Sequence, residues 1–488
     1  MKNITEDLAP QKVFYFFEEI SKIPRGSKKE KKISDWLVKF ANDRNLEVYQ
    51  DATLNVVIKK AGSKRYEDYS PLILQGHMDM VWEKNSDTKF DFETEGIKLA
   101  VKDGFLKATG TTLGADNGIA VAVILAVLDS DEIMHPPIEA VITADEEAGM
   151  TGVENLDVSV LKGKTMLNID TEEEGEIYVS SAGGSRVQID FNFTRGSEPA
   201  DSKNILLEIK GLNGGHSGSD INKGLGNSIK ILSFILSELA KKFKFQLCDI
   251  KGGDKTNAIP REAFAIVNIT LAELDNFIKE SKIFFEEIKT TYSKTEQNLT
   301  MEIKESTAAD KKPLSKEDSI NLINLLCEIP SGVIANSEHI EGLVETSLSM
   351  GVLRTRDTVS SIQLLLRSSV NSALRELENK LKDISNLYNA GFTVDSSYSS
   401  WEYKEDSKLR ELFTKAHENL FEKTPKIKAI HAGLECGIFA GKISDLDVIS
   451  IGPNIYGAHT PEERMEISSV EYTWKWVLKA LELYRIKQ

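Results

Sequence analysis

The stretch from Ile138 to Gly149, IEAVITADEEAG, constrains the fold of this chain most strongly. Mostly apolar or β-branched residues run directly into three acids, Asp145, Glu146 and Glu147. A short apolar run of this kind suits a strand buried on both faces of a parallel sheet. The acids would then lie at the carboxyl end of the strand, where open α/β sheets bind their ligands. A solvent-exposed acidic loop explains this stretch equally well, so other segments must decide.

Other segments also place acids or histidines after apolar runs or in turns. His77 follows the strand-like run 71–75, Asp170 follows the run 165–169, and Asp116 lies in a Gly-containing turn, TTLGADN. His459 lies in a loop near the carboxyl terminus. So many carboxylates in one cleft would repel one another by several kcal/mol unless cations held them together. The pattern therefore favours a pair of divalent metal ions.

The types of residue favour particular metals. Imidazole and carboxylate ligands without thiolate suit Zn²⁺, with Mn²⁺ or Co²⁺ as alternatives. His77 taken alone is better explained as a core or surface histidine, but Asp79 can accept its ring N–H and so orient it. Asp116 taken alone is better explained as a helix N-cap, because it stands where the turn meets the apolar helix predicted over 118–128.

The order of predicted strands and helices along the chain predicts an α/β domain interrupted by an insertion. A length of 488 residues exceeds what one core usually organises. Apolar strands and helices occupy residues 1–184 and return over 399–488, which we predict to form one α/β domain with a mainly parallel sheet. Residues 185–398 alternate like half-exposed strands between amphipathic helices and predict an inserted α+β domain. The recurring order of elements in this insertion suggests an internal duplication.

Charge and cysteine content limit the partners and the compartment. The formal net charge of −16 argues against a nucleic-acid or anionic-membrane partner. No apolar run approaches the ~20 residues of a membrane-spanning helix, and the amino terminus lacks a signal-peptide pattern. Three widely spaced cysteines, Cys248, Cys327 and Cys436, suit a reducing compartment. We therefore expect a cytoplasmic protein.

Six motifs follow one another along the chain: QGHMDMV, TTLGADNGIAVA, TADEEAGMTG, NIDTEEEGE, HAGLECG and GAHTPEER. They resemble those of the co-catalytic zinc peptidases that include aminoacylase and glutamate carboxypeptidase. The resemblance is closest to the aminoacyl-histidine dipeptidase branch, bacterial cytosolic enzymes that act on dipeptides including β-alanyl-histidine. It spans almost the whole chain, and the motifs keep the order and approximate spacing of the family.

The resemblance implies two Zn²⁺ ions per chain, with Co²⁺ or Mn²⁺ able to substitute. It places His77 and Asp170 on one metal, Glu147 and His459 on the other, and Asp116 between them. Glu146 would be the general base that takes a proton from a water bridging the metals. Asp79 would orient His77. Asp145 receives no role.

The resemblance also implies that residues 1–184 and 399–488 form the catalytic domain and that residues 185–398 form its lid, and it implies groups that bind the substrate. His216 in GLNGGHSG would help to hold the oxyanion, while Asn257, Arg367 and Gly433 would bind the substrate. Arg367 taken alone is better explained as a surface ion pair. Lid closure would restrict the substrates to dipeptides. A homodimer is expected on the resemblance alone.

These observations lead to a metal-dependent dipeptidase that hydrolyses Xaa-His and other dipeptides. One alternative is an N-acyl amino acid deacylase that uses the same metal site, since both reactions hydrolyse an amide next to a carboxylate. The other is a non-catalytic peptide-binding protein that keeps the fold. Glu435 in HAGLECG either borders the metal site or caps the Gly-rich turn.

Overall fold

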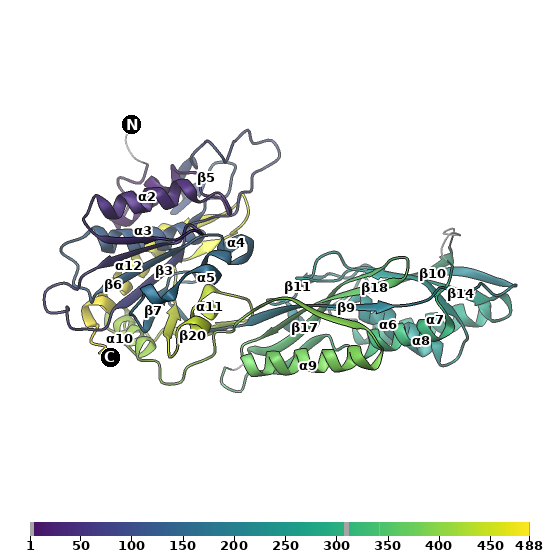
Figure 1. Ribbon diagram of the computed structural model, residues 1–488. Coiled ribbons are helices and arrows are strands. Elements are labelled where there is room, and N and C mark those ends of the chain that lie inside the picture. Colours follow the sequence, from purple (N-terminus) through teal and green to yellow (C-terminus); the bar gives the residue numbers. More distant parts are fainter. Residues whose placement is uncertain (1–3, 307–311, 341, 488) are drawn as a thin grey trace. The chain divides into compact units, whose positions relative to one another are not determined.

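A computed structural model describes residues 4–306, 312–340 and 342–487, and the chain divides into two compact units (Figure 1). Unit 1 contains the residues up to Ser181, Trp401–Ala429 and the residues from Leu434 onward. Unit 2 contains Ala182–Ser400 and Ile430–Gly433. The assignment of catalysis to one domain and of a lid to the other stays a prediction.

An eight-stranded mixed sheet forms the centre of unit 1. In spatial order its strands are β1 (Glu47–Gln50), β2 (Val56–Lys60), β6 (Ile138–Thr143), β3 (Leu72–His77), β7 (Thr165–Asn168), β21 (Asp447–Ser450), β8 (Glu176–Ser181) and β20 (Lys426–Ile430). The four middle strands, β6, β3, β7 and β21, run parallel to one another. The predicted α/β class is thereby confirmed, with antiparallel strands added towards the edges.

The opening stretch, 138–149, begins with a buried strand as predicted, β6 over 138–143, and ends in the short helix α4 (Glu146–Gly149). All six residues of β6 and all six of β3 are buried, which requires cover on both faces of the sheet. The helices of unit 1 are α1 (Gln11–Ser21), α2 (Lys31–Asn42), α3 (Ala115–Asp129), α4 (Glu146–Gly149), α5 (Thr151–Asn155), α10 (Lys408–Phe421), α11 (Glu435–Lys442) and α12 (Ile467–Leu483). Helix α3 packs on β3 and is apolar on nearly all sides, as expected of a buried helix.

The sequence analysis missed a second, small antiparallel sheet in unit 1. Its strands are, in order, β22 (Ile455–Tyr456), β23 (Arg464–Glu466), β5 (Phe105–Ala108) and β4 (Leu99–Lys102). Strands of two to four residues carry too little alternation to be recognised, and pairing with a distant segment stabilises them. This sheet brings the loop that carries His459 next to the segment before α3.

Unit 2 is built on a nine-stranded antiparallel sheet. Its strands are, in order, β15 (Thr300–Glu305), β10 (Ser202–Lys210), β14 (Ala263–Thr270), β12 (Gln246–Gly252), β17 (Val344–Thr355), β18 (Val359–Ser368), β9 (Gly183–Asn192) and β19 (Gly391–Tyr398), with β16 (Gly332–Asn336) also paired to β17. Four helices cover one face and enclose a large apolar core: α6 (Ser228–Ala240), α7 (Leu271–Thr291), α8 (Lys316–Glu328) and α9 (Asn371–Leu387) (Figure 1). The predicted inserted α+β domain is confirmed, whereas its internal duplication stays a prediction.

Candidate metal centre

Three parallel strands deliver predicted site residues to one edge of the sheet in unit 1. His77 is the last residue of β3, Glu146 begins α4 shortly after β6, and Asp170 follows β7. The register aligns these strand ends, because His77 lies beside Thr143 of β6 and Gln75 lies beside Asn168 of β7. Parallel strands therefore bring residues together that are far apart in the sequence.

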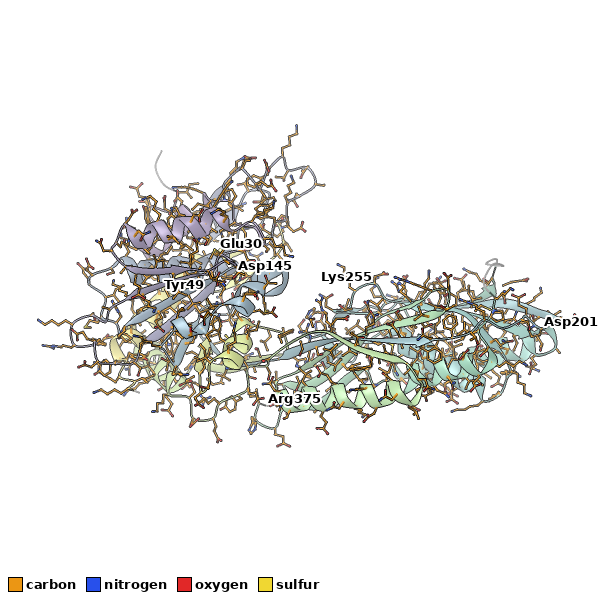
Figure 2. All side chains as sticks on the ribbon, viewed as in Figure 1. Glu30, Tyr49, Asp145, Asp201, Lys255 and Arg375 are labelled. Carbon is orange, nitrogen blue, oxygen red and sulfur yellow. The ribbon has the colours of Figure 1, made fainter. Side chains whose placement is uncertain are left out.

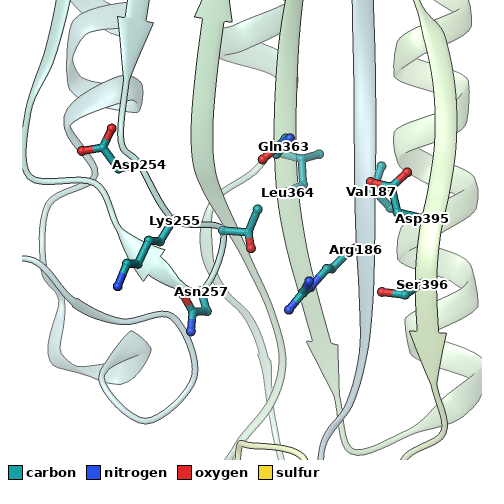
Figure 3. A pocket seen from close by; sticks show the side chains of 10 residues that line it. Arg186, Val187, Asp254, Lys255, Asn257, Gln363, Leu364, Asp395 and Ser396 are labelled. Atoms are coloured by element: carbon teal, nitrogen blue, oxygen red, sulfur yellow. The ribbon is translucent and has the colours of Figure 1, made fainter. Parts of the chain in front are cut away.

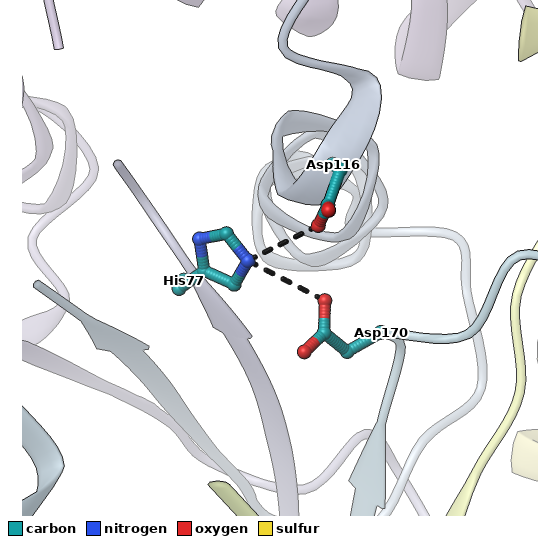
Figure 4. Close-up of side chains that lie close together, drawn as sticks. All are labelled: His77, Asp116 and Asp170. Atoms are coloured by element: carbon teal, nitrogen blue, oxygen red, sulfur yellow. Dashed lines mark hydrogen bonds and ion pairs between the residues drawn. The ribbon is translucent and has the colours of Figure 1, made fainter. Parts of the chain in front are cut away.

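Asp116 lies between the two predicted histidine ligands. Its backbone is non-helical (φ −78°, ψ 106°) although it lies in the first turn of α3, and Gly114 rather than Asp116 occupies the N-cap position. One carboxylate oxygen of Asp116 is 3.2 Å from His77 Nε2, and the other is 3.1 Å from His459 Nε2. His77 Nε2 is also 3.5 Å from Asp170 Oδ1 (Figure 4). A carboxylate that faces two imidazoles has the geometry of a bridging ligand.

The potential ligand atoms form three overlapping groups, each with its atoms within 4.8 Å of one another. The groups are His77 with Asp116 and Asp170, Asp116 with Glu147 and His459, and His77 with Glu146 and Glu147. The first two match the two predicted metal positions that share Asp116. Nitrogen and oxygen donors without a thiolate fit a pair of divalent cations such as zinc.

The acids and imidazoles of this cluster shift one another's pKa values. Hydrogen bonds to Asp116 and Glu147 raise the pKa of His459 to about 11. Burial opposes protonation of His77, but Asp170 and Asp116 outweigh it and hold its pKa well above the usual range. Burial raises the pKa of Asp170 to about 6 and also raises that of Glu146. The carboxylates therefore favour positive charge on the groups beside them, which is the charge that a divalent cation would supply.

Asp79 contacts both His77 and the start of α4. It is fully buried, and its Oδ1 lies 3.3 Å from His77 Nδ1. The backbone N–H groups of Glu146 and Glu147 donate to its two oxygens at 3.1 and 3.2 Å, and Ser27 Oγ donates at 2.8 Å. Asp79 therefore lies within reach of the imidazole and anchors the α4 turn, while its role in orienting His77 remains a prediction.

Two acids without an assigned role have structural partners. Asp145 adopts a left-handed backbone (φ 56°) and accepts a hydrogen bond from Thr151, while its N–H donates to Glu30 Oε1 at 3.0 Å (Figure 2). Glu435 is fully buried and accepts hydrogen bonds from Gln75 and Thr143, which belong to the strands below the metal centre. Burial raises the pKa of Glu435 to about 7.

The predicted lid residues all belong to unit 2. His216 in β11 (Gly215–His216) pairs with Ala258 in β13 (Ala258–Ile259), which brings His216 and Asn257 close together. Asn257 lines a pocket of about 550 Å³ with Arg186 and Lys255 (Figure 3). The roles of His216 and Asn257 remain predictions.

Arg367 is buried, contrary to the alternative of a surface ion pair. Only 6% of it is exposed, and its Nε has no hydrogen-bond partner among the described residues. Its Nη1 donates to the Tyr398 hydroxyl at 3.3 Å, and Gly433 lies against the ring of Tyr398. His431, also in unit 2, is hydrogen-bonded to Ser347 at 2.7 Å. A buried, under-partnered guanidinium suits the binding of an anion.

Two buried charged residues next to the metal centre were missed by the sequence analysis. Arg25 is 1% exposed and donates to the backbone carbonyl groups of Met78, Asp79 and Gly114. Glu463 is 2% exposed and accepts from the turn that carries Asp116. Both stand in charged stretches, IPRGSKK and TPEER, that are typical of solvent-exposed loops, so no local signal marks them.

The family model for peptidase family M20/M25/M40 matches residues 73–483, a range that includes every predicted metal ligand. The chain belongs to this peptidase family. A cytosol non-specific dipeptidase of Escherichia coli (strain K12) is 37% identical over 97% of this chain and 98% of its own length.

A crystal structure of a family relative agrees with the fold of the chain. The aminoacylhistidine dipeptidase of Vibrio alginolyticus matches with a TM-score of 0.93 and 37% identity, covering 99% of this chain and 98% of its own. The aminopeptidase PepT of Bacillus cereus shares the fold at 17% identity and a TM-score of 0.56, covering 98% and 99% of the two chains. Within the described residues, no helix has the length and apolar character needed to cross a membrane.

Proposed function

We propose that this chain is a dinuclear metal-dependent dipeptidase with zinc as its metal. One observation carries the proposal: Asp116 lies between His77 and His459 at 3.2 and 3.1 Å, in a cluster of N and O donors. Nearly full-length likeness to two proteins named dipeptidases supports the substrate class. The proposed substrates are Xaa-His and other dipeptides, including β-alanyl-histidine.

The proposed roles follow from the positions of the side chains in unit 1. His77 and Asp170 would hold one metal, Glu147 and His459 would hold the other, and Asp116 would contribute to both. When bound, the metal pair lowers the pKa of an attacking water and polarises the scissile carbonyl group. These assignments are supported by the donor groups within 4.8 Å of one another.

Glu146 is the proposed general base. Its Oε2 lies 4.0 Å from His77 Nε2, at the rim of the ligand cluster. Burial raises the pKa of its carboxyl group, and a carboxylate within reach of the attacking water is a suitable proton acceptor. Its carboxylate takes a proton from the attacking water and delivers it to the leaving amine.

The lid roles, the compartment and the assembly belong to the same proposal. We assign His216 to the oxyanion, and Asn257, Arg367 and Gly433 to the substrate; the buried guanidinium of Arg367 supports a carboxylate partner. The cytoplasm is the proposed compartment, in keeping with the name of the Escherichia coli relative. A homodimer is the proposed assembly, and sedimentation equilibrium tests it.

A substrate panel tests the proposed function. Metal-reconstituted protein is assayed against β-alanyl-histidine, α-dipeptides, tripeptides and N-acetyl amino acids. A dipeptidase cleaves the first two and leaves the others nearly untouched, because it requires a free amine and a short substrate. Preference for N-acetyl amino acids would identify a deacylase instead. Absence of hydrolysis with metal bound would favour a binding protein.

A further inference from the structure

The carboxylate of Glu463 occupies a turn of four consecutive backbone N–H groups. One oxygen accepts from Leu113 and Gly114 at 2.7 and 3.0 Å, and the other accepts from Ala115 and Asp116 at 2.8 and 3.4 Å. The side chain is buried, with 2% of the residue exposed. We call this arrangement the Glu463 contact.

The backbone of the turn explains why an anion is held there. Gly114 has a left-handed conformation (φ 70°, ψ 33°), which allows successive N–H groups to point to the same side. Such a concave run of N–H groups binds anions. The turn also opens helix α3, whose amino-terminal end carries partial positive charge. A carboxylate therefore satisfies donors that the helix leaves unpaired.

The Glu463 contact joins two segments that each carry a proposed metal ligand. Glu463 lies four residues after His459, on the same loop, and the last N–H group of the turn is that of Asp116 itself. Asp116 and His459 face each other at 3.1 Å. His459 has a left-handed backbone (φ 62°) and is half exposed, so its position depends on what anchors its loop.

Arg25 connects the same turn to a third ligand segment. Its Nη1 donates to the carbonyl groups of Met78 and Asp79 at 3.0 and 3.1 Å, and its Nη2 donates to that of Gly114 at 2.5 Å. The turn therefore has its N–H groups bound by Glu463 and a carbonyl group bound by Arg25. The segment after His77 is held by the same guanidinium.

We propose that Glu463 is a positioning residue that sets Asp116 and His459 in their binding geometry before the metal ions arrive. This inference rests on the proposed function and deepens it. Glu463 itself contacts neither metal nor substrate; it acts through the backbone of Asp116 and through the His459 loop. Because preorganised ligands lose less freedom when they bind, loss of the contact weakens metal binding.

Glutamine cannot replace Glu463 in this contact. Each carboxylate oxygen accepts from two N–H groups, so either orientation of a glutamine amide turns its NH₂ group towards two donors. The neighbouring Glu462 is exposed and provides a matched control for the same chemical change. Comparison of Glu463→Gln with Glu462→Gln isolates the contact from the loss of one negative charge near the site.

The test measures metal affinity by competition between the protein and a chromophoric chelator for Zn²⁺. For Glu463→Gln we expect metal affinity to fall ~10- to 100-fold, the usual effect of losing a partner that orients a ligand. Circular dichroism verifies that the variant is folded, and Glu462→Gln should bind like the wild type. Unchanged metal affinity in a folded Glu463→Gln protein would overturn the inference.

A second measurement uses the wild-type protein and does not depend on the variant. In metal-free protein the amide hydrogens of residues 113–116 should exchange slowly, with little further protection after Zn²⁺ is added. Rapid exchange that becomes slow only with metal would refute positioning before binding. Both readouts are independent of turnover: a protein whose metal affinity depends on Glu463 but which cleaves no dipeptide would refute the proposed function and leave this inference intact.

Discussion

Substitution of Asp79 by asparagine tests how the protein holds its metal ligands. Asp79 Oδ1 faces His77 Nδ1 and the N–H of Glu146, while Oδ2 accepts from Ser27 Oγ and the N–H of Glu147. Asparagine has nearly the same shape but one oxygen fewer. Its NH₂ group must therefore point towards one of these two pairs of donors.

The contacts of residue 79 select one orientation of the asparagine amide, and the groups that lose a partner set the expected losses of stability and metal affinity. The Ser27 hydroxyl can rotate and accept from the amide, so the NH₂ group should take the Oδ2 position and leave the N–H of Glu147 without a partner. A buried donor left without its partner costs about 1–3 kcal/mol. The lost charge beside His77 also weakens its orientation, which typically lowers metal affinity 10- to 100-fold.

Two assays measure these effects. Chelator competition should show ~10- to 100-fold weaker binding of Zn²⁺ to Asp79→Asn, and thermal unfolding of the metal-free protein should show a loss of stability. Asp87→Asn, at an exposed position, is the control and should behave like the wild type. A metal affinity within about 3-fold of the wild-type value is a much smaller loss than the one expected for such a partner and would refute the reasoning.

Three further predictions concern catalysis, pH and substrate binding. Glu146→Gln should keep its metal but slow turnover ~10²-fold or more, whereas Glu154→Gln should turn over like the wild type. Similar turnover rates in Glu146→Gln and the wild type would exclude the general-base role. Burial and the nearby Arg367 lower the pKa of His431 to about 4. In the unfolded chain His431 therefore binds a proton that it does not bind in the folded protein. The contribution of His431 to the free energy of unfolding is complete above pH ~6.5 and declines towards pH 4. Between pH 7 and 5, urea unfolding should show the wild type losing about 2 kcal/mol more stability than His431→Asn, because the other groups titrate in both proteins; an equal pH dependence of the two proteins would contradict this role of His431. Arg367→Lys should raise KM ~10-fold or more with a smaller change in kcat, unlike the exposed Arg375→Lys, and an unchanged KM would reject the carboxylate role.

The sequence predicted the parts of the fold and site that follow from strand ends. Parallel strands terminate at one edge of a sheet, so acids and a histidine placed after β3, β6 and β7 had to converge. The neighbouring Glu146 and Glu147 follow β6 in the short helix α4, so both lie at this edge of the sheet. The resemblance to a peptidase family then supplied the expected roles.

The remaining features depend on contacts between distant segments. Nothing near Glu463 or Arg25 in the sequence shows that these charges are buried, because the groups they bind belong to the turn before α3 and to the segment after β3. The burial of Arg367 likewise depends on how unit 2 packs around it. The small sheet of unit 1 was missed because its strands are short and find their partners far along the chain.

Metal stoichiometry in the wild type and in His459→Ala tests the central claim most directly. Each protein is stripped of metal, reconstituted with Zn²⁺, desalted and analysed by inductively coupled plasma mass spectrometry. Two metals per wild-type chain and one per His459→Ala chain, with dipeptide hydrolysis lost in the variant, are the expected results. An unchanged metal content in His459→Ala, or fewer than two metals in an active wild-type enzyme, would contradict the proposed metal pair.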